Sequence, residues 1–286
     1  MKSVILTNIQ RGSLHDGPGV RVTFFFQGCN LFCKWCHNPE TRPLKPTLIE
    51  YSEKCIACGL CKEFCKNDSC IACGECAKVC PTGAKALTGK AYTTEEMLFI
   101  ALRESAFFGK NGGVTCSGGE PLLQIEGLTE FLSLCKKHNI HTAVDTALNV
   151  DWCNFEKIIP YTDLFLADYK HFDENEHIRY TGVSRRIIIE NLKKLCENDV
   201  KVILRMPIIT GVHDNEEYIN AAGNELLKIG FKGEIELLPF HRLGCKKYIA
   251  LNQNYDFAET LPPSDAKIKL LSQKLKDLGL NVKEGV

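Results

Sequence analysis

The stretch "VRVTFFFQGCNLFCKWCHNPE", residues 20–40, joins an apolar run to three closely spaced cysteines. Its first nine residues are mostly β-branched or aromatic and end at a glycine, which is typical of a buried strand. Cys29, Cys33 and Cys36 follow with the spacing C-x3-C-x2-C. A four-iron cluster held by these three thiolates would keep one iron open for an amino and a carboxylate group of a small molecule. The alternative is a closed cluster that takes His37 or a remote cysteine as its fourth ligand.

Length, charge and cysteine content narrow the class of protein. The 286 residues suit one α/β barrel domain or two small domains, and the 35 basic and 35 acidic residues cancel. A neutral chain is not typical of a nucleic-acid binder or a binder of anionic membranes. No apolar stretch approaches the roughly 18 residues of a membrane span, and the N-terminus lacks a signal-peptide run. We therefore expect a cytoplasmic protein with reduced thiols, in which 16 cysteines indicate metal or redox chemistry.

Strands and helices alternate over most of the chain. After the strand at residues 20–28, apolar runs predict five further strands, at 112–120, 140–146, 162–172, 200–209 and 234–244. Amphipathic stripes predict helices at 93–109, 128–139, 186–199, 217–230 and 264–279. Near-continuous apolar strands separated by helices indicate a parallel sheet with covered faces. The pattern predicts an α/β fold, a partial (β/α)6 TIM-like barrel, with its chemistry at the carboxyl ends of the strands.

Residues 46–90 interrupt this pattern with eight cysteines and few large apolar side chains. Such a segment cannot build a core of its own size and is expected to be held together by metal. The runs "CIACGLCKEFC" from Cys55 and "CIACGECAKVC" from Cys70 align without gaps and share the bacterial ferredoxin spacing C-x2-C-x2-C-x3-C. We therefore expect a small ferredoxin-like iron–sulfur insert at residues 46–90, within a barrel made of residues 1–45 and 91–286.

The ferredoxin arrangement also implies which cysteines share a cluster, because the fourth cysteine of each run there ligates the cluster of the other run. Carried over, it implies two 4Fe–4S clusters in addition to the one at the three-cysteine loop. One would take Cys55, Cys58, Cys61 and Cys80. The other would take Cys65, Cys70, Cys73 and Cys76. The alternative is a pair of zinc knuckles, although zinc sites usually use two widely separated pairs of ligands.

The second predicted strand closes with "SGGE", residues 117–120. Two glycines allow close backbone approach to a ligand, and a carboxylate can receive an ammonium group. Together with the three-cysteine loop, in which Trp35 precedes the last cysteine, this turn resembles the radical S-adenosylmethionine superfamily and its motif C-x3-C-x-aromatic-C. The resemblance implies that the methionine end of S-adenosylmethionine fills the open iron position, and that Gly118, Gly119 and Glu120 bind its amine.

Further segments narrow the resemblance to one family within that superfamily. The segments are "HDGPGVRVTFFFQGC", "GGVTCSGGEPLLQ", "DLFLADYKHFD", "LRMPIITGVHDN" and "ELLPFHRLG". In this order they resemble the activating enzymes of glycyl radical enzymes, of which pyruvate formate-lyase activase is the best-known member. That activase lacks a ferredoxin insert, whereas relatives that activate dehydratases, decarboxylases and C–C, C–N or C–S lyases carry one at this place. The resemblance therefore implies a partner of the latter kind.

The resemblance implies an oxidoreductase that cleaves S-adenosylmethionine reductively to a 5′-deoxyadenosyl radical, which then removes a hydrogen from a backbone glycine of a large partner enzyme. A flavodoxin or ferredoxin would donate the electron through the clusters of the insert. No acid–base residue is needed for this chemistry, which agrees with the lack of a Ser/His/Asp or paired-carboxylate arrangement in the sequence.

The resemblance also implies roles for residues beyond the two motifs. Trp35 and His37 would lie against the adenosyl part, Asp168 and Lys170 would meet the ribose or the carboxylate, and Arg205 and His241 would complete the pocket rim. Asp145, Thr146 and Asp168 match a monovalent cation site. Asp16, Gly17 and Arg21 match the region that receives the partner's glycine loop. For each of these residues the alternative is an ordinary polar side chain at a strand end or in a turn.

Two other functions remain open from the residues alone. The chain could be an iron–sulfur electron-transfer protein, with the insert as its working part and the barrel as scaffold. It could also be a radical S-adenosylmethionine enzyme that acts on a small molecule or on anaerobic ribonucleotide reductase. The first alternative gives no use to the three-cysteine loop and the "SGGE" turn.

Overall fold

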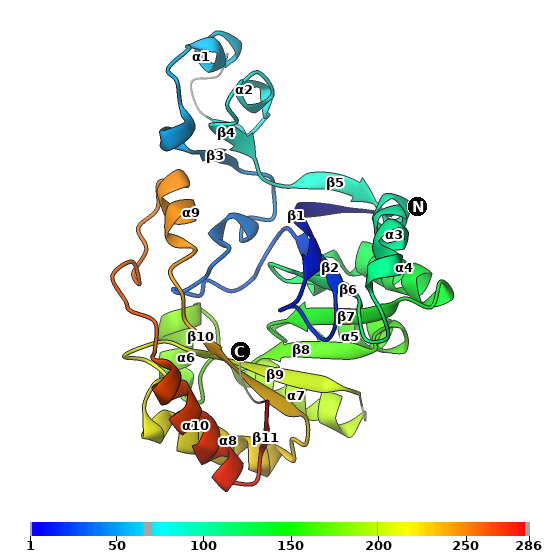
Figure 1. Cartoon of the computed structure of the whole chain (residues 1–286), viewed down its shortest axis with the longest axis vertical. Coiled ribbons are helices and arrows are strands. Elements are labelled where there is room, and N and C mark those ends of the chain that lie inside the picture. The colour runs from blue at the N-terminus through cyan, green and yellow to red at the C-terminus, as the bar shows by residue number, and fades with distance from the viewer. Residues whose placement is uncertain (1, 66–69, 199, 284–286) are drawn as a thin grey trace.

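The computed structural model describes residues 2–65, 70–198 and 200–283 and has a mixed α/β fold (Figure 1). Its main sheet has nine strands in the order β11-β10-β9-β8-β7-β6-β2-β1-β5. The six predicted strands lie side by side and are parallel. They are β2 (Arg21–Phe26), β6 (Gly113–Gly118), β7 (His141–Thr146), β8 (Leu164–Asp168), β9 (Val202–Ile208) and β10 (Glu234–Pro239). The prediction of six parallel strands is therefore confirmed.

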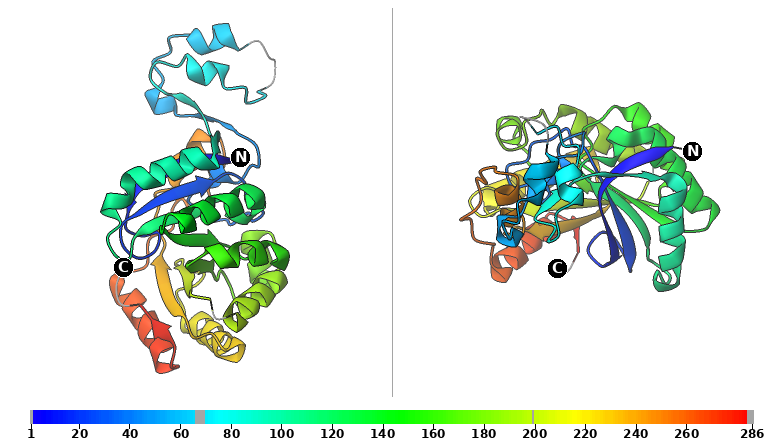
Figure 2. Two further views of the ribbon diagram at one scale, coloured as in Figure 1. Left: turned by 90° about the vertical axis from the view of Figure 1, so that its right-hand side faces the viewer. Right: turned by 90° about the horizontal axis from the view of Figure 1, so that it is seen from above.

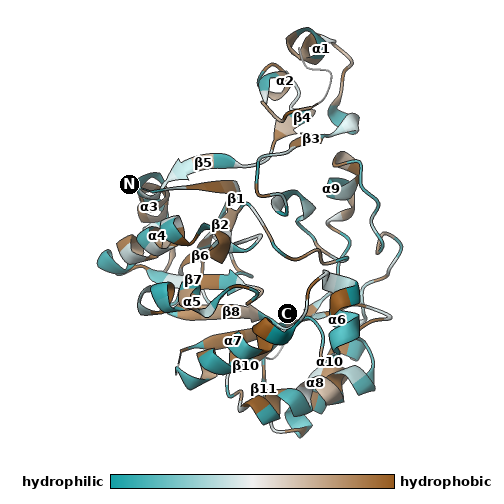
Figure 3. Cartoon of the chain, turned by 180° about the vertical axis from the view of Figure 1, so that it is seen from behind, coloured by the Kyte–Doolittle hydropathy of each residue, from teal (hydrophilic) through white to brown (hydrophobic). Residues whose placement is uncertain are grey.

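Helices connect these strands and cover the outer face of the curved sheet (Figure 2). They are α3 (Thr94–Glu104), α4 (Ile125–Lys137), α5 (Trp152–Ile158), α6 (Glu174–Thr181), α7 (Arg186–Glu197), α8 (Glu216–Ile229) and α10 (Asp265–Asp277). The capping box at the start of α3 is present, with Thr93 and Glu96 bonded to each other's backbone. The hydrophobic residues of the strands (Figure 3) meet the apolar stripes of these helices, as where Phe24 and Phe131 pack edge to face.

Three further strands extend the sheet beyond the predicted six. β1 (Ser3–Ser13) pairs antiparallel with β2, and β5 (Lys90–Thr93) pairs antiparallel with β1. At the other edge, β11 (Asn281–Val282) is parallel to β10. The sheet therefore begins and ends with strands that the sequence did not predict.

The described residues between 46 and 89 form a projection above the main sheet (Figures 1 and 2), whereas Lys90 already belongs to β5. The projection contains a two-stranded sheet of β3 (Leu48–Glu50) and β4 (Lys85–Leu87), and the short helices α1 (Leu60–Phe64) and α2 (Glu75–Lys78). Among its described residues, the buried apolar side chains are those of Ile49, Cys76 and Ala84. So small a core agrees with the expectation that metal must hold this part together.

None of the helices within residues 2–65, 70–198 and 200–283 is long and apolar enough to cross a membrane.

Candidate functional site

The three-cysteine loop leaves β2 at the carboxyl edge of the sheet, and backbone hydrogen bonds fix its shape. Its start is joined to its exit, because Gly28 N donates to Thr41 O at 2.6 Å and Cys29 N donates to Arg42 O at 3.0 Å. Its middle is tied to the end of α6, where Phe32 N donates to Thr181 O at 2.8 Å. The protein backbone therefore holds the loop at both ends and in the middle.

The "SGGE" turn lies directly against the start of this loop. β2 and β6 pair in a register that sets Phe26 opposite Gly118, and Glu120 N donates to Gly28 O at 2.7 Å. A Cβ atom at Gly119 would lie 2.0 Å from Gly28 O, and Gly118 has a φ of +115°. Both glycines are thus required by the close approach of two backbones, before any ligand is considered.

The Glu120 carboxylate is fully buried and is turned toward the end of β7. It accepts hydrogen bonds from Thr146 Oγ1 at 2.9 Å, from Ala147 N at 2.9 Å and from Leu122 N at 3.3 Å. Burial raises the pKa of Glu120 to about 7, although these hydrogen bonds oppose the shift. The carboxylate therefore links the ends of β6 and β7, and near neutral pH it is partly protonated.

A buried lysine stands beside the cysteines at the end of β8. Lys170 Nζ lies 2.7 Å from Asp168 Oδ2, and the Lys170 side chain is only 13% exposed. Burial by itself would lower the pKa of Lys170, but the charges of Asp168 and Cys33 outweigh it and raise the pKa above its ordinary value. The site thus contains a permanent cation next to a thiol.

The thiols of the loop are poor anions without a metal. Burial raises the pKa of Cys29 to about 12 and that of Cys33 to about 11. Iron must therefore displace their protons, and the positive charge of Lys170 favours the resulting thiolates. Buried polar atoms without a hydrogen-bond partner, among them His37 Nε2 and Thr210 Oγ1, further indicate that a polar group belongs in this part of the molecule. These residues fit an iron–sulfur cluster with a polar ligand.

The predicted aromatic residues belong to the cysteine loop itself and pack against rings from other segments. Trp35 is 6% exposed and contacts the rings of Tyr180 and His213, with centroids 5.6 and 5.0 Å away. His37 stacks on His241 at 3.8 Å. Burial lowers the pKa of His37 to about 4, so both faces of this stack are neutral at physiological pH. The structure thus joins the cysteine loop to the segment after β10, as a pocket rim requires.

The carboxylates expected at a cation site already face cationic side chains of the protein. Asp145 Oδ2 lies 3.5 Å from Arg205 Nη1 and accepts a hydrogen bond from Ser117 Oγ at 2.7 Å. Burial raises the pKa of Asp145 to about 6, while Arg205 opposes this shift. Thr146 donates to Glu120, and Asp168 pairs with Lys170. Within the described residues no three His, Cys, Asp or Glu side chains are arranged around a single ion, so the monovalent cation stays a prediction.

Arg21 differs from its expected place on a partner-binding surface, because it is 0% exposed. It begins β2, at the opposite edge of the sheet from Cys29. Its Nε donates to Thr115 Oγ1 at 2.7 Å and its Nη1 to Pro18 O at 3.0 Å. Asp16 is also turned inward and accepts from Thr23 Oγ1 at 2.7 Å. In this structure Arg21 supports the turn before β2 and offers no surface to a peptide.

The eight cysteines of residues 46–90 surround one cavity of about 580 Å³. Its lining cysteines are Cys55, Cys58, Cys61, Cys65, Cys70, Cys73, Cys76 and Cys80. A cavity lined by eight thiols can hold metal, and iron–sulfur clusters and zinc ions both stay predictions for it. Residues 66–69 of the connector lie outside the described residues.

The two cysteine runs also share one backbone conformation. Ala57 and Ala72 have φ values of 54° and 52°, and Gly59 and Gly74 both have 81°. Equivalent residues therefore make equivalent turns, as the sequence repeat predicts.

Within this cavity Cys76 interacts electrostatically with three other thiols. Burial raises the pKa of Cys76, Lys85 opposes this shift, and the thiols of Cys65, Cys70 and Cys73 raise the pKa further. This neighbourhood is the group that the ferredoxin arrangement implies for one cluster.

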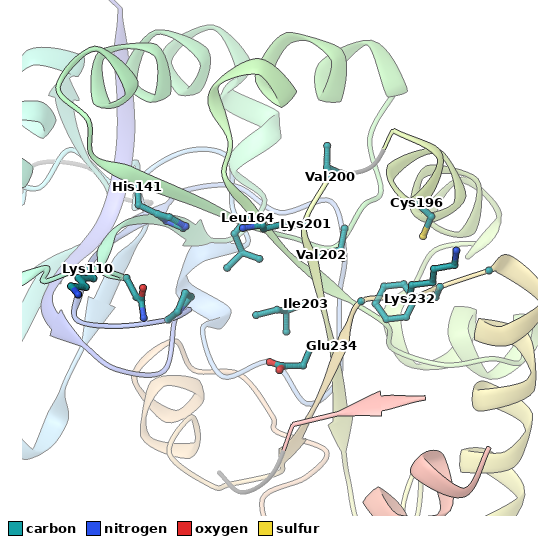
Figure 4. Close-up of a pocket in the computed structure, with 15 residues that line it drawn as sticks. Lys110, His141, Leu164, Cys196, Val200, Lys201, Val202, Ile203, Lys232 and Glu234 are labelled. Carbon is teal, nitrogen blue, oxygen red and sulfur yellow. The ribbon is translucent and has the colours of Figure 1, made fainter. Parts of the chain in front are cut away.

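A further cavity, of about 740 Å³, lies elsewhere (Figure 4). It is lined at the amino ends of the strands by residues such as His141, Ile203 and Glu234, and by the loop residue Lys110. None of the predicted site residues is among its described lining residues. This cavity therefore lies at the opposite edge of the sheet from the cysteine loop.

Comparisons with known proteins agree with this geometry. Residues 15–189 match a family described as a 4Fe-4S single cluster domain. The chain is 36% identical to the 4-hydroxyphenylacetate decarboxylase activating enzyme of Clostridioides difficile over 304 residues, which cover 96% of this chain and 94% of that protein. It is 37% identical over 273 residues to the (2S)-3-sulfopropanediol dehydratase activating enzyme of Klebsiella oxytoca, covering 88% of this chain and 86% of that protein.

A solved structure, a domain of the pyruvate-formate lyase-activating enzyme of Bacteroides vulgatus, superposes with a TM-score of 0.52 at 31% identity, covering 61% of this chain and 99% of that chain. The chain is thus a radical S-adenosylmethionine enzyme, an oxidoreductase that uses S-adenosylmethionine and an iron–sulfur cluster. The chain belongs to the family of glycyl-radical-enzyme activating enzymes.

Proposed function

We propose that this activating enzyme uses Cys29, Cys33 and Cys36 to hold a 4Fe–4S cluster with one open iron, at which S-adenosylmethionine binds. The observation that carries the proposal is the hydrogen-bonded contact between the cysteine loop and the "SGGE" turn, beside the Lys170–Asp168 pair. When bound, the cluster and S-adenosylmethionine supply a carbon-centred radical by one-electron cleavage of the sulfonium, and that radical takes hydrogen from a glycine of the partner.

The residues of the chain bind, orient and shield these groups. The backbone of Gly118 and Gly119 gives the methionine amine close access, and Lys170 supplies a counter-charge for its carboxylate. The Trp35 ring and the stacked pair of His37 and His241 would form an aromatic wall for the adenosyl part. Glu120 fixes the turn through its bonds to β7. Such a wall excludes water and thereby protects a reactive carbon radical.

Charged residues inside the barrel would complete the site. Arg205 orients Asp145 beside the site. A monovalent cation near Asp145, Thr146 and Asp168 would displace the cationic side chains from these carboxylates. Asp16 and Gly17 would approach the partner's glycine loop, and Arg21 would hold their turn in place. The consecutive parallel strands, covered by helices on one face, support a partial TIM-like barrel of residues 1–45 and 91–286.

The insert at residues 46–90 would be ferredoxin-like and hold two more 4Fe–4S clusters. The first would use Cys55, Cys58, Cys61 and Cys80, and the second Cys65, Cys70, Cys73 and Cys76. The cavity lined by all eight cysteines and the grouping around Cys76 support this assignment. An electron from a cytoplasmic flavodoxin or ferredoxin would pass through these clusters to the barrel.

The partner would be a glycyl radical enzyme that carries out a decarboxylation, a dehydration or a C–N or C–S cleavage. Support comes from the two relatives compared above, which activate a decarboxylase and a dehydratase and align with this chain over most of its length. The test is a glycyl-radical EPR doublet after anaerobic incubation with partner enzymes of each class. A doublet on pyruvate formate-lyase alone would contradict this choice of partner.

The test of the proposed reaction uses anaerobically reconstituted protein with dithionite and S-adenosylmethionine. Wild-type protein should form 5′-deoxyadenosine, and Cys33→Ala should form none above background. Cys153→Ala is the matched control, because Cys153 is exposed on α5 and far along the chain from the loop. Formation of 5′-deoxyadenosine by Cys33→Ala at the wild-type rate would contradict the assignment of the open cluster.

A further inference from the structure

Arg42 connects the two ends of the three-cysteine loop. It lies six residues after Cys36, and its carbonyl oxygen accepts the hydrogen bond from Cys29 N at 3.0 Å. Burial by itself would lower the pKa of Arg42, but the nearby Cys36 and Tyr248 raise it above its ordinary value. One residue therefore contacts the first cysteine of the loop through its backbone and carries its charge close to the last.

One N–H group of the Arg42 guanidinium has no acceptor. Its Nε is buried and has no hydrogen-bond partner in the described structure. A guanidinium carries five N–H donors in a planar fork, and a buried donor without an acceptor is unfavourable. Because Nε belongs to the guanidinium that lies near Cys36, the sulfur atoms of a cluster bound at the loop are available as its acceptor.

Two tyrosines hold this arginine in place. Arg42 Nη2 donates to Tyr248 Oη, and the guanidinium carbon lies 5.4 Å from the centre of the Tyr248 ring. Tyr248 stacks on Tyr255 at 4.3 Å, and Tyr255 Oη donates to Trp35 O at 3.4 Å. Tyr248 belongs to α9 (Cys245–Ala250). The segment after β10 thus fixes the orientation of Arg42 over the loop.

Helix α9 is itself fastened to the exit of the loop by Lys247. The Nζ atom of Lys247 contacts Asn38 Oδ1 at 2.6 Å and Glu40 Oε1 at 2.5 Å. The arrangement therefore depends on two segments about 200 residues apart in the sequence, which makes it a built feature of the fold and not a chance approach of one long side chain.

We propose that Arg42 is a positioning residue that donates hydrogen bonds to the sulfurs of the cluster at Cys29, Cys33 and Cys36, and that its charge stabilises the reduced form of that cluster. This inference rests on the proposed function, because it takes the open cluster as given. Reduction adds one negative charge to the cluster, and a nearby cation favours the more negative state. Removing the charge should therefore make the cluster harder to reduce.

The test is a potentiometric titration of the holoenzyme followed by EPR, with and without S-adenosylmethionine. Only the signal that changes when S-adenosylmethionine is added is followed, so the insert does not interfere. Arg42→Met should lower the equilibrium constant for reduction about tenfold, which corresponds to a midpoint about 59 mV more negative. Arg42→Lys keeps a charge without the planar fork and should give a smaller decrease. Arg186→Met, at an exposed position on α7, should match wild type.

The outcomes separate this inference from the proposed function. If wild-type protein gives no signal that responds to S-adenosylmethionine, the proposed function fails. If wild type responds and Arg42→Met keeps its midpoint, the role of Arg42 is overturned. If Arg42→Met does not assemble the responsive cluster, Arg42→Lys and Tyr248→Phe decide. Tyr248→Phe retains the arginine but removes its anchor, and wild-type midpoints in both variants would overturn the proposal, whereas a lowered midpoint in either supports it.

Discussion

The two cysteine-rich regions of this enzyme are held in different ways. In the three-cysteine loop, backbone bonds to Thr41, Arg42 and Thr181 set the shape, and Cys33 is only 9% exposed. In residues 46–90, five of the eight cysteines are exposed and the described core is three small side chains. We therefore expect the barrel to shape its site before iron binds, and the insert to need iron in order to fold. Cysteine ligands would then enter a preformed site in one region and supply folding free energy in the other.

The strongest test of this contrast is removal of iron by an anaerobic chelator. We expect residues 46–90 to lose their structure, because metal binding there supplies the folding free energy. Proteolytic cleavage within 46–90 should become at least about tenfold faster, while cleavage within the barrel changes little. Limited proteolysis with mass spectrometry measures both regions in one experiment. Equal protection of the insert with and without iron would break the comparison.

A smaller but still large effect is expected when the preformed site itself is altered. Gly119→Ala would place a Cβ 2.0 Å from Gly28 O, so the loop start must shift. We expect a loss of about 3 kcal/mol in the free energy of unfolding and less iron at the loop. Denaturant unfolding and iron analysis measure these two effects.

Gly211→Ala is the control for this substitution. Gly211 has a φ of +81° and nothing within 4 Å, so alanine there costs only backbone strain, about 1 kcal/mol. If both variants lose the same stability and retain the same iron, the contact between the "SGGE" turn and the loop is not what prepares the site.

The sequence predicted the central sheet well because buried parallel strands are continuous apolar runs. It did not predict β1 and β5, for physical reasons. β1 reads "SVILTNIQRGS", and most of its residues after Leu6 are polar because its second half lies at an exposed part of the edge. β5 has only four residues, "KAYT", and its order comes from pairing with β1. Such edge strands take their structure from a neighbour and not from their own pattern.

The sequence predicted those parts of the candidate site that depend on a fixed spacing of residues along the chain. It did not predict those that depend on a hydrogen-bond partner far away in the sequence. The cysteine spacings and the glycines of "SGGE" could be recognised in the chain itself. The burial of Arg21 could not, because its acceptor Thr115 is 94 residues away. Arg42 likewise lies 206 residues from Tyr248. An arginine at the start of an apolar strand was the one signal that Arg21 could be structural.

If the barrel site is preformed, the buried carboxyl group of Glu120 should make the stability of the barrel depend on pH. Because burial raises its pKa to about 7, the folded protein holds this proton more tightly than the unfolded chain. The resulting stabilisation is fully present below the ordinary pKa of about 4.5 and is lost as the pH rises toward 7, at about 1.4 kcal/mol per unit. Glu120→Gln has no such proton.

The measurement is denaturant unfolding of cluster-free wild type and Glu120→Gln between pH 5 and pH 8. As the pH rises, the unfolding free energy of wild type should fall relative to that of Glu120→Gln. This difference should level off above about pH 7. Asp145 titrates in both proteins and largely cancels in the difference. A difference that stays constant over this range would mean that Glu120 is not buried in the cluster-free barrel.

The smallest expected effect comes from Lys247, which fastens α9 to the exit of the cysteine loop. Its contacts to Asn38 and Glu40 are partly exposed, so Lys247→Met should cost only about 0.5–1 kcal/mol of stability. Lys274→Met is the control, because it breaks a comparable pair with Glu216 far along the chain from the site. Thermal unfolding should therefore give similar small shifts for both variants.

The two lysine variants should differ in one respect, which returns to the contrast between the regions. If helix α9 helps to prepare the loop, Lys247→Met should weaken binding of S-adenosylmethionine several-fold by loosening the segment that carries Tyr248, and Lys274→Met should not. Calorimetric titration of the reconstituted protein measures this affinity. Equal affinities in the two variants would show that the hydrogen bonds within the loop suffice, and that the barrel prepares its site without help from the segment after β10.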